Sequence, residues 1–107
     1  MTTQQFEREA RVVERWDRCF RVMSAEPRRQ VIASLLDTPP TESVSLPESA
    51  INPNIPVENE RLEVALHHNH LPMLSEMGYV EWGTEPFEAE RGPRFDEVAV
   101  LFKSLYS

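Results

Sequence analysis

A switch of hydrophobic period at Gly78 limits the folds that are open to this chain. Residues 57–77 carry apolar side chains at the 3.6-residue period of a helix, and Gly78 is the left-handed cap expected at its end. Residues 79–83 alternate at the two-residue period of a strand. Pro72 removes one backbone hydrogen bond from the helical pattern, so we expect a kink near residues 68–72. The chain therefore passes directly from a long, bent helix into a small β-element.

Apolar spacing and capping residues predict four further helices. An N-terminal helix over residues 4–23 has one apolar face, formed by Phe6, Val13, Trp16, Phe20 and Met23. A second helix follows Ser24 and ends near Asp37. A very short helix is expected around residues 47–51, and the last helix occupies the C-terminal segment 96–107. Residues 87–90 and 94–95 flank Arg91-Gly92-Pro93, which predicts a second strand with a tight turn, or a ragged hairpin.

Length and composition exclude several classes of protein. The 107 residues fit one domain, residues 1–107, and contain no apolar run long enough to cross a membrane. We see no signal peptide, and the single cysteine excludes an internal disulfide framework, so we expect a cytoplasmic protein. With three glycines, no Gly-rich phosphate loop and no Gly-x-Ser-x-Gly motif, the chain is not expected to be an enzyme or to need a cofactor.

The charge is strongly acidic and unevenly placed. Eleven basic and eighteen acidic residues give −7, and seven of the basic residues are arginines within residues 1–30. Such a chain is not a typical nucleic-acid binder, but it resembles the proteins of salt-adapted cytoplasms. The arginines of the N-terminal helix could bind phosphate, although acid-first pairs four residues apart favour a solvated helix face.

The predicted order of elements, together with three segments, resembles a known family. A winged helix-turn-helix domain with added N-terminal and C-terminal helices has the same order of elements: two helices, a short helix, a long helix, a hairpin and a last helix. Residues 23–36 and 70–80 resemble the first core helix and the end of the recognition helix of ArsR-type transcriptional regulators. Residues 65–74, with the pattern Ala-Leu-x-His-x-His-Leu-Pro-x-Leu, resemble an uncharacterised winged-helix family of salt-loving archaea. The resemblance implies a mainly α fold with a small β-hairpin, a winged-helix core over residues 24–95, and a role in transcription.

A DNA-binding role assigns contacts to two regions. Arg61, His67, His68 and Asn69 on the long helix could face base edges or phosphates. Arg91 and Arg94 would contact the backbone or minor groove from the wing tip, or belong to a solvated turn. The helix begins with Glu58, Glu60 and Glu63, however, and these acids would repel phosphates.

The histidines and the outer helices have alternative interpretations. His70 is expected to be a hydrogen-bonded packing residue. Glu63, His67 and His70 share a spacing that could hold a metal ion, but no second ligand set is visible and no metal is assigned.

The outer helices carry apolar side chains that need a cover. We expect a two-fold dimer interface, or alternatively burial within the monomer, for Trp16, Phe20, Leu101, Phe102 and Leu105.

Two functions follow from these expectations. The first is a homodimeric, winged-helix regulator that binds double-stranded DNA. The alternative is a winged-helix protein-interaction module that does not bind DNA directly. A continuous positive surface that joins helix 57–77 to the wing would favour the regulator, and its absence would favour the interaction module.

Overall fold

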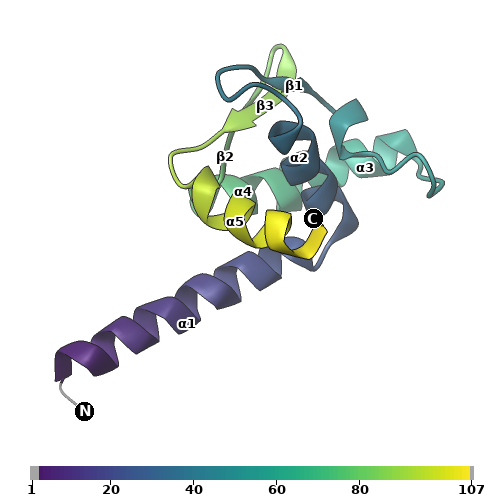
Figure 1. Ribbon diagram of the computed structural model, residues 1–107. Helices are drawn as coiled ribbons and strands as arrows, with labels where there is room; N and C mark the ends of the chain where they lie inside the picture. The colour runs from purple at the N-terminus through teal and green to yellow at the C-terminus, as the bar shows by residue number, and fades with distance from the viewer. Residues whose placement is uncertain (1–2, 107) are drawn as a thin grey trace.

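The computed structural model describes residues 3–106 and is mainly helical, with a small antiparallel sheet, as expected in outline (Figure 1). In chain order its elements are α1 (Thr3–Met23), α2 (Glu26–Leu36), β1 (Val44–Ser45), η1 (Glu48–Ala50), α3 (Asn59–Ala65), η2 (Leu66–His70), α4 (Leu71–Glu76), β2 (Val80–Thr84), β3 (Phe87–Arg91) and α5 (Phe95–Tyr106). All five predicted helices are therefore confirmed, and one strand is added. Within the described residues no helix is both long and apolar enough to span a bilayer.

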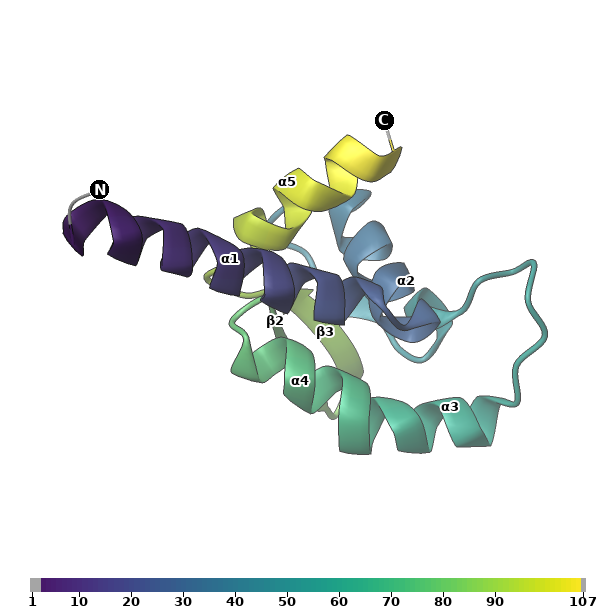
Figure 2. The ribbon, with the colours of Figure 1, turned by 90° about the horizontal axis from the view of Figure 1, so that it is seen from below.

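Helix α1 extends away from the rest of the molecule, as Figures 1 and 2 both show. Its buried residues, Cys19, Val22 and Met23, all lie in its last two turns. Every residue from Thr3 to Asp17 is exposed to solvent. Of the predicted apolar face only Met23 is buried, although from Val12 onward the helix lies beside α5.

The long helix bends where Pro72 predicts a kink. Helix α3 continues into the wider π-type turn η2 and then into α4. The proline has no N–H to donate and its ring crowds the carbonyl group four residues earlier. The backbone therefore widens by one residue, and the N–H of Leu71 donates to the carbonyl of Leu66. The two halves of the helix keep Leu62, Leu66 and Leu74 in one core.

Gly78 ends this helix as expected, with a φ of +81°. The N–H of Tyr79 donates to the Leu74 carbonyl at 3.0 Å, and this hydrogen bond, which spans five residues, is the one that closes a Schellman-type helix cap. The hairpin is not closed at residues 91–93 as predicted, because β2 and β3 pair from Val80↔Arg91 to Thr84↔Phe87. Residues 92–95 do form a turn, with the Phe95 N–H donating to the Gly92 carbonyl at 3.1 Å, but this turn leads into α5. The tip of the hairpin is therefore the Glu85–Pro86 pair, and Arg91 stands at its base.

The third strand, β1, was not predicted. It pairs with β3 at Val44↔Ala89 and Ser45↔Glu88, so the strand order is β1-β3-β2. Two residues offer no periodic pattern to detect, and their partner lies more than forty positions away. The segment was expected as a loop with apolar residues that could pack, and Val44 and Leu46 are indeed buried.

Helix α5 contributes a large part of the core. Phe95, Val98 and Ala99 are buried against the rest of the body. Leu101 and Phe102 are only 7% and 6% exposed, so the structure corrects their assignment to a dimer interface. Both are largely enclosed within the monomer, as in the alternative expectation, although Leu101 also lines a groove between α1 and α5, and Leu105 remains exposed.

Candidate functional site

The two arginines assigned to a wing tip do not lie at one. Arg91 donates from Nη2 to the carbonyl oxygens of Leu35 and Thr38, at 2.9 and 3.1 Å. Its guanidinium also lies 4.7 Å from the centre of the Phe95 ring. The side chain is half-buried and ties β3 to the end of α2. Arg91 is therefore a structural clamp, and this correction removes it from the DNA-contact set.

Arg94 lies beyond the hairpin, next to the start of α5. Its Nε donates to Glu97 at 2.6 Å, and this contact raises the pKa of Arg94 and lowers that of Glu97. Glu97 also pairs with Arg15 of α1 at 3.0 Å. The Glu97 carboxylate is shared by both arginines at the junction of α1 and α5, so Arg94 is held in an ion pair within the monomer and does not lie at the tip of the hairpin.

His67 packs on the hairpin instead of facing solvent. Its ring stacks on Phe87 at 4.4 Å and meets the edge of Trp82 at 5.6 Å. Its Nδ1 donates to the carbonyl of Glu63 at 2.8 Å, because a carbonyl can only accept. The prediction of His67 as a base contact is therefore corrected to a packing role between the bent helix and the sheet.

Three predicted contact residues do remain accessible. Arg61, His68 and Asn69 are exposed along the bent helix. Arg61 forms an ion pair with Glu58 at 3.3 Å, and both side chains are largely exposed. This region therefore carries a weakly paired cation among the acids that were expected to repel phosphate.

The outer face of the sheet is acidic. The side chains of Glu81, Glu88 and Glu90 share the face that alternation directs away from the core, and Glu81 stands directly opposite Glu90. With Glu85 near the tip, they line one shallow hollow. Like charges opposite each other destabilise a sheet and repel phosphate. Within strands β2 and β3, which the structure describes in full, the one basic side chain is Arg91, and it is half-buried against α2, so no run of exposed cations leads from the bent helix along the hairpin.

His70 is buried, as expected, and its partner is Arg28. Because a guanidinium only donates, the Nδ1 of His70 accepts from Nη1 of Arg28 at 3.0 Å. Arg28 also donates to the carbonyls of Arg21 and Val22, at 2.9 and 3.1 Å, and thereby caps the C-terminus of α1. Burial, and then the charge of Arg28, lower the pKa of His70. Sequence patterns gave no signal for this cap, because a buried arginine has no distinctive spacing.

The three residues of the alternative metal site, Glu63, His67 and His70, do not point toward a common position. His70 is turned toward Arg28, whereas His67 is held by Phe87 and the backbone of Glu63. Over residues 3–106 no group of three ligand-type side chains converges on a position for an ion.

The clearest apolar surface lies on α1. Phe6, Val13, Phe20 and Trp16 are 65%, 57%, 52% and 47% exposed, so the predicted face exists and is left uncovered. Trp16 and Phe20 stack with ring centres 5.6 Å apart. The predicted interface therefore keeps Trp16 and Phe20, and it gains Phe6 and Val13 of the same face.

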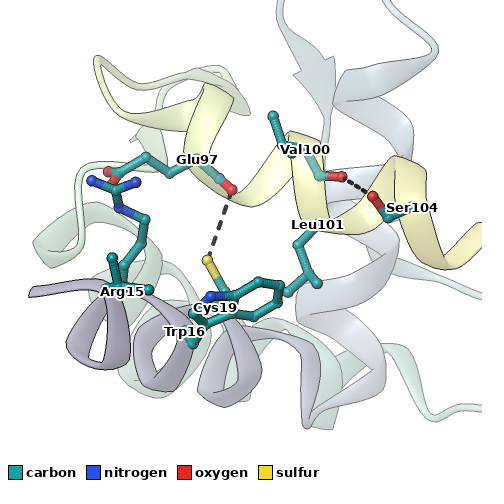
Figure 3. Close-up of a pocket in the computed structure, with 8 residues that line it drawn as sticks. Arg15, Trp16, Cys19, Glu97, Val100, Leu101 and Ser104 are labelled. Atoms are coloured by element: carbon teal, nitrogen blue, oxygen red, sulfur yellow. Dashed lines mark hydrogen bonds and ion pairs between the residues drawn. The ribbon is translucent and has the colours of Figure 1, made fainter. Parts of the chain in front are cut away.

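This surface runs into a groove between α1 and α5 (Figure 3). The groove has a volume of about 230 Å³, and its lining is formed by Val12, Arg15, Trp16, Cys19, Glu97, Val100, Leu101 and Ser104. Cys19 lies 3.6 Å from the hydroxyl of Tyr79, and burial raises the pKa of that tyrosine to about 12. Sequence reasoning missed Val12 and Val100, although each lies one residue from a position already assigned to an apolar face.

Comparison with known proteins gives a family and no function. No curated protein and no solved structure matches the chain. A family model described as a domain of unknown function, DUF7344, matches residues 20–86. The match begins in the last turn of α1 and ends at the tip of the hairpin, so it covers more than half of the chain. The chain therefore belongs to the DUF7344 family of domains of unknown function.

Proposed function

We propose that the protein is a winged-helix protein-interaction module that forms a homodimer through α1. The observation that carries the proposal is the uncovered apolar face of that helix. Four large hydrophobic side chains that are each about half exposed, on a helix that leaves the body, form the kind of surface that marks a protein partner. A partner that covers this apolar face would also stabilise a helix that extends so far from the small core of its own chain.

The order of elements supports the winged-helix part of the proposal. A helix (α2), a short strand (β1), a short helix (η1), a long helix (α3–η2–α4) and a hairpin (β2–β3) follow one another. The first strand pairs with the last, giving the order β1-β3-β2. Helices α1 and α5 are then additions at each end. Because a fold does not fix a function, the choice between functions rests on the surfaces.

The surface charge favours a protein partner over DNA. Of the six predicted DNA contacts, Arg91 is clamped to the backbone of α2, Arg94 is ion-paired with Glu97, and His67 is packed on the hairpin. The hairpin that would lie beside the DNA backbone presents glutamates in their place. Bringing these charges close to phosphates is unfavourable, and most non-specific DNA affinity comes from cations that neutralise phosphates.

A DNA-retention assay in 0.1 M and 2 M potassium chloride, with sedimentation in the same buffers, tests the proposal. We expect a dimer in both buffers and no retention of duplex DNA in either. A monomer at all accessible concentrations would contradict the dimer, and specific retention would contradict the interaction module.

The second candidate is a DNA-binding transcriptional regulator, also homodimeric. It is favoured by one observation, the exposure of Arg61, His68 and Asn69 together on the bent helix. If DNA is retained, replacing these three residues with alanine should abolish retention and leave the dimer intact. Glu76→Ala, at an exposed position farther along the same helix, is the control and should leave retention unchanged or stronger.

A further inference from the structure

We infer that two copies pair their α1 helices antiparallel, so that Phe6 of each copy enters the α1–α5 groove of the other. The inference rests on the proposed function, because it specifies how the homodimer is built. It commits to a second copy as the occupant of the groove and gives that copy one orientation.

The apolar face of α1 has the spacing of a helix-pairing seam. Phe6, Val13 and Phe20 recur every seven residues, and Glu9 and Trp16 occupy the position three residues after the first two of them. Alternating steps of three and four residues place these side chains along one line, which is the arrangement that two-stranded helix pairs use. The seam crosses the projecting half of α1 and meets the groove at Trp16, which belongs to both.

The positions of the uncovered surfaces favour the antiparallel orientation. The groove lies beside the C-terminal half of α1, whereas the fully exposed half is N-terminal. An antiparallel partner brings its exposed half onto the groove, with residue 11 at the midpoint and Phe6 level with Trp16 of the partner copy. An apolar cavity of about 150 Å³ can hold benzene. The groove of about 230 Å³ therefore has room for the ring of Phe6.

Charge favours the same orientation. Helix α1 carries five arginines and four acids, a net +1, so the remainder of the −7 chain carries −8. A parallel pair would bring two bodies of −8 to the same end and place Glu9 against Glu9. An antiparallel pair separates the bodies to opposite ends and places Glu9 against Val13. The nearly neutral helix is therefore the part of the chain that a second copy can approach with the least repulsion.

Disulfide cross-linking tests the orientation directly. In a Cys19→Ser background, Phe6→Cys and Trp16→Cys are prepared as separate proteins, mixed at equal concentration and oxidised. In the proposed pair the two Phe6 positions are about 15 Å apart along the helices, at 1.5 Å per residue, whereas Phe6 and Trp16 are level. We expect cross-linked dimer in the mixture and almost none in either protein alone.

Each outcome decides a separate question. Cross-linking of Phe6→Cys with itself would show a parallel pair and overturn the inference. No cross-link in the mixture, although the Cys19→Ser protein sediments as a dimer, would overturn the orientation and leave the proposed homodimer standing. A Cys19→Ser protein and an unmodified protein that both sediment as monomers would overturn the homodimer itself.

A spin-label measurement leaves the seam side chains unchanged. Thr3→Cys in the Cys19→Ser background carries the label at an exposed polar position at the start of α1. The two labelled positions are about 24 Å apart along the axis in the antiparallel pair and level in a parallel pair. A label–label distance well above 20 Å is expected, and a distance near 10 Å contradicts the proposed orientation even if the cysteine variants of the seam fail to associate.

Discussion

At the scale of single residues, Arg91 has a structural role within the fold, whereas Arg94 forms an ion pair at the surface. Arg91→Ala removes the donor from two backbone carbonyls and the contact over Phe95. We expect a loss of about 2 kcal/mol in the free energy of unfolding, because the carbonyls of Leu35 and Thr38 lose a charged donor. Arg94→Ala, which breaks an exposed ion pair with Glu97, should cost about 0.5 kcal/mol. Urea denaturation measures both, and equal losses would contradict the clamp assigned to Arg91.

The pair of Arg28 and His70 predicts a stability that depends on pH. Burial and the nearby guanidinium lower the pKa of His70 below its ordinary 6.5, so the unfolded chain takes up a proton before the folded chain does. Stability is therefore complete above about pH 6.5 and declines as the pH falls through the folded-state pKa. Urea midpoints between pH 8 and pH 5 measure this decline.

The matched variants for this dependence are His70→Gln and His68→Gln. His70→Gln should flatten the decline, whereas His68→Gln, at an exposed position on the same turn, should retain it. Hydrogen bonds from Asn52 and Arg94 lower the pKa values of Glu26 and Glu97 below 4.5, so these groups act at more acidic pH. A decline that survives His70→Gln unchanged would rule out this histidine as its source.

Residue-level expectations succeeded where the helical pattern was enough. Gly78 as a left-handed cap and His70 as a buried packing residue both follow from their places in that pattern, whereas Arg28, the partner of His70, comes from α2 and was not predicted. Arg91 and His67 were misassigned because their partners come from α2 and from the hairpin. No spacing within one element reveals such contacts.

At the scale of elements, we expect very different effects from an alanine substitution at Gly92, at the base of the hairpin, and at Gly83, near its tip. A Cβ on Gly92 would lie 2.5 Å from the Gly78 carbonyl and 2.8 Å from the Val80 nitrogen, whereas a Cβ on Gly83 meets nothing within 4 Å. Backbone atoms cannot move aside as a flexible side chain can, so Gly92→Ala should cost about 2 kcal/mol or more. Gly83→Ala should be neutral or slightly stabilising, because alanine restricts the unfolded chain.

Thermal unfolding of these two glycine variants checks the expectation, with near-ultraviolet circular dichroism to report whether packing survives. Equal midpoints would contradict the close backbone approach at Gly92. A glycine followed by a proline is typical of turns, and a turn does follow Gly92, but it joins β3 to α5 and does not close the hairpin. The glycine also lets the chain after β3 pass close to the end of α4.

Helix periodicity was the most informative signal among the elements. The bent helix, its interruption near Pro72 and the C-terminal helix all follow from patterns within one segment. Strand β1 and the true hairpin tip depend on pairing between distant segments, so the sequence alone did not reveal them. The acidic sheet face follows from the register, which is known only once the tip is located.

At the scale of the whole molecule, the hydrophobic core is buried within the monomer, but the apolar face of α1 is not. The body encloses a continuous core from Val22 to Phe102, but the seam of α1 stays exposed. The prediction of an interface from Trp16 and Phe20 therefore stays a prediction with a defined surface, while Leu101 and Phe102 belong to the core. The sequence already places acidic residues at the start of the bent helix, whereas the acidic face of the sheet became visible only with the strand register.

Sedimentation equilibrium of two single variants that each add one negative charge to α1 tests the central proposal most directly. Val13→Glu places the charge on the apolar seam, and Gln4→Glu places it on an exposed polar position of the same helix. An unpaired charge buried in the interface costs about 3 kcal/mol, so we expect Val13→Glu to weaken the dimer roughly 100-fold. The unmodified protein and Gln4→Glu should remain dimers, with equal helical content in all three. A Val13→Glu protein that dimerises as tightly as Gln4→Glu would contradict the assignment of α1 as the interaction surface.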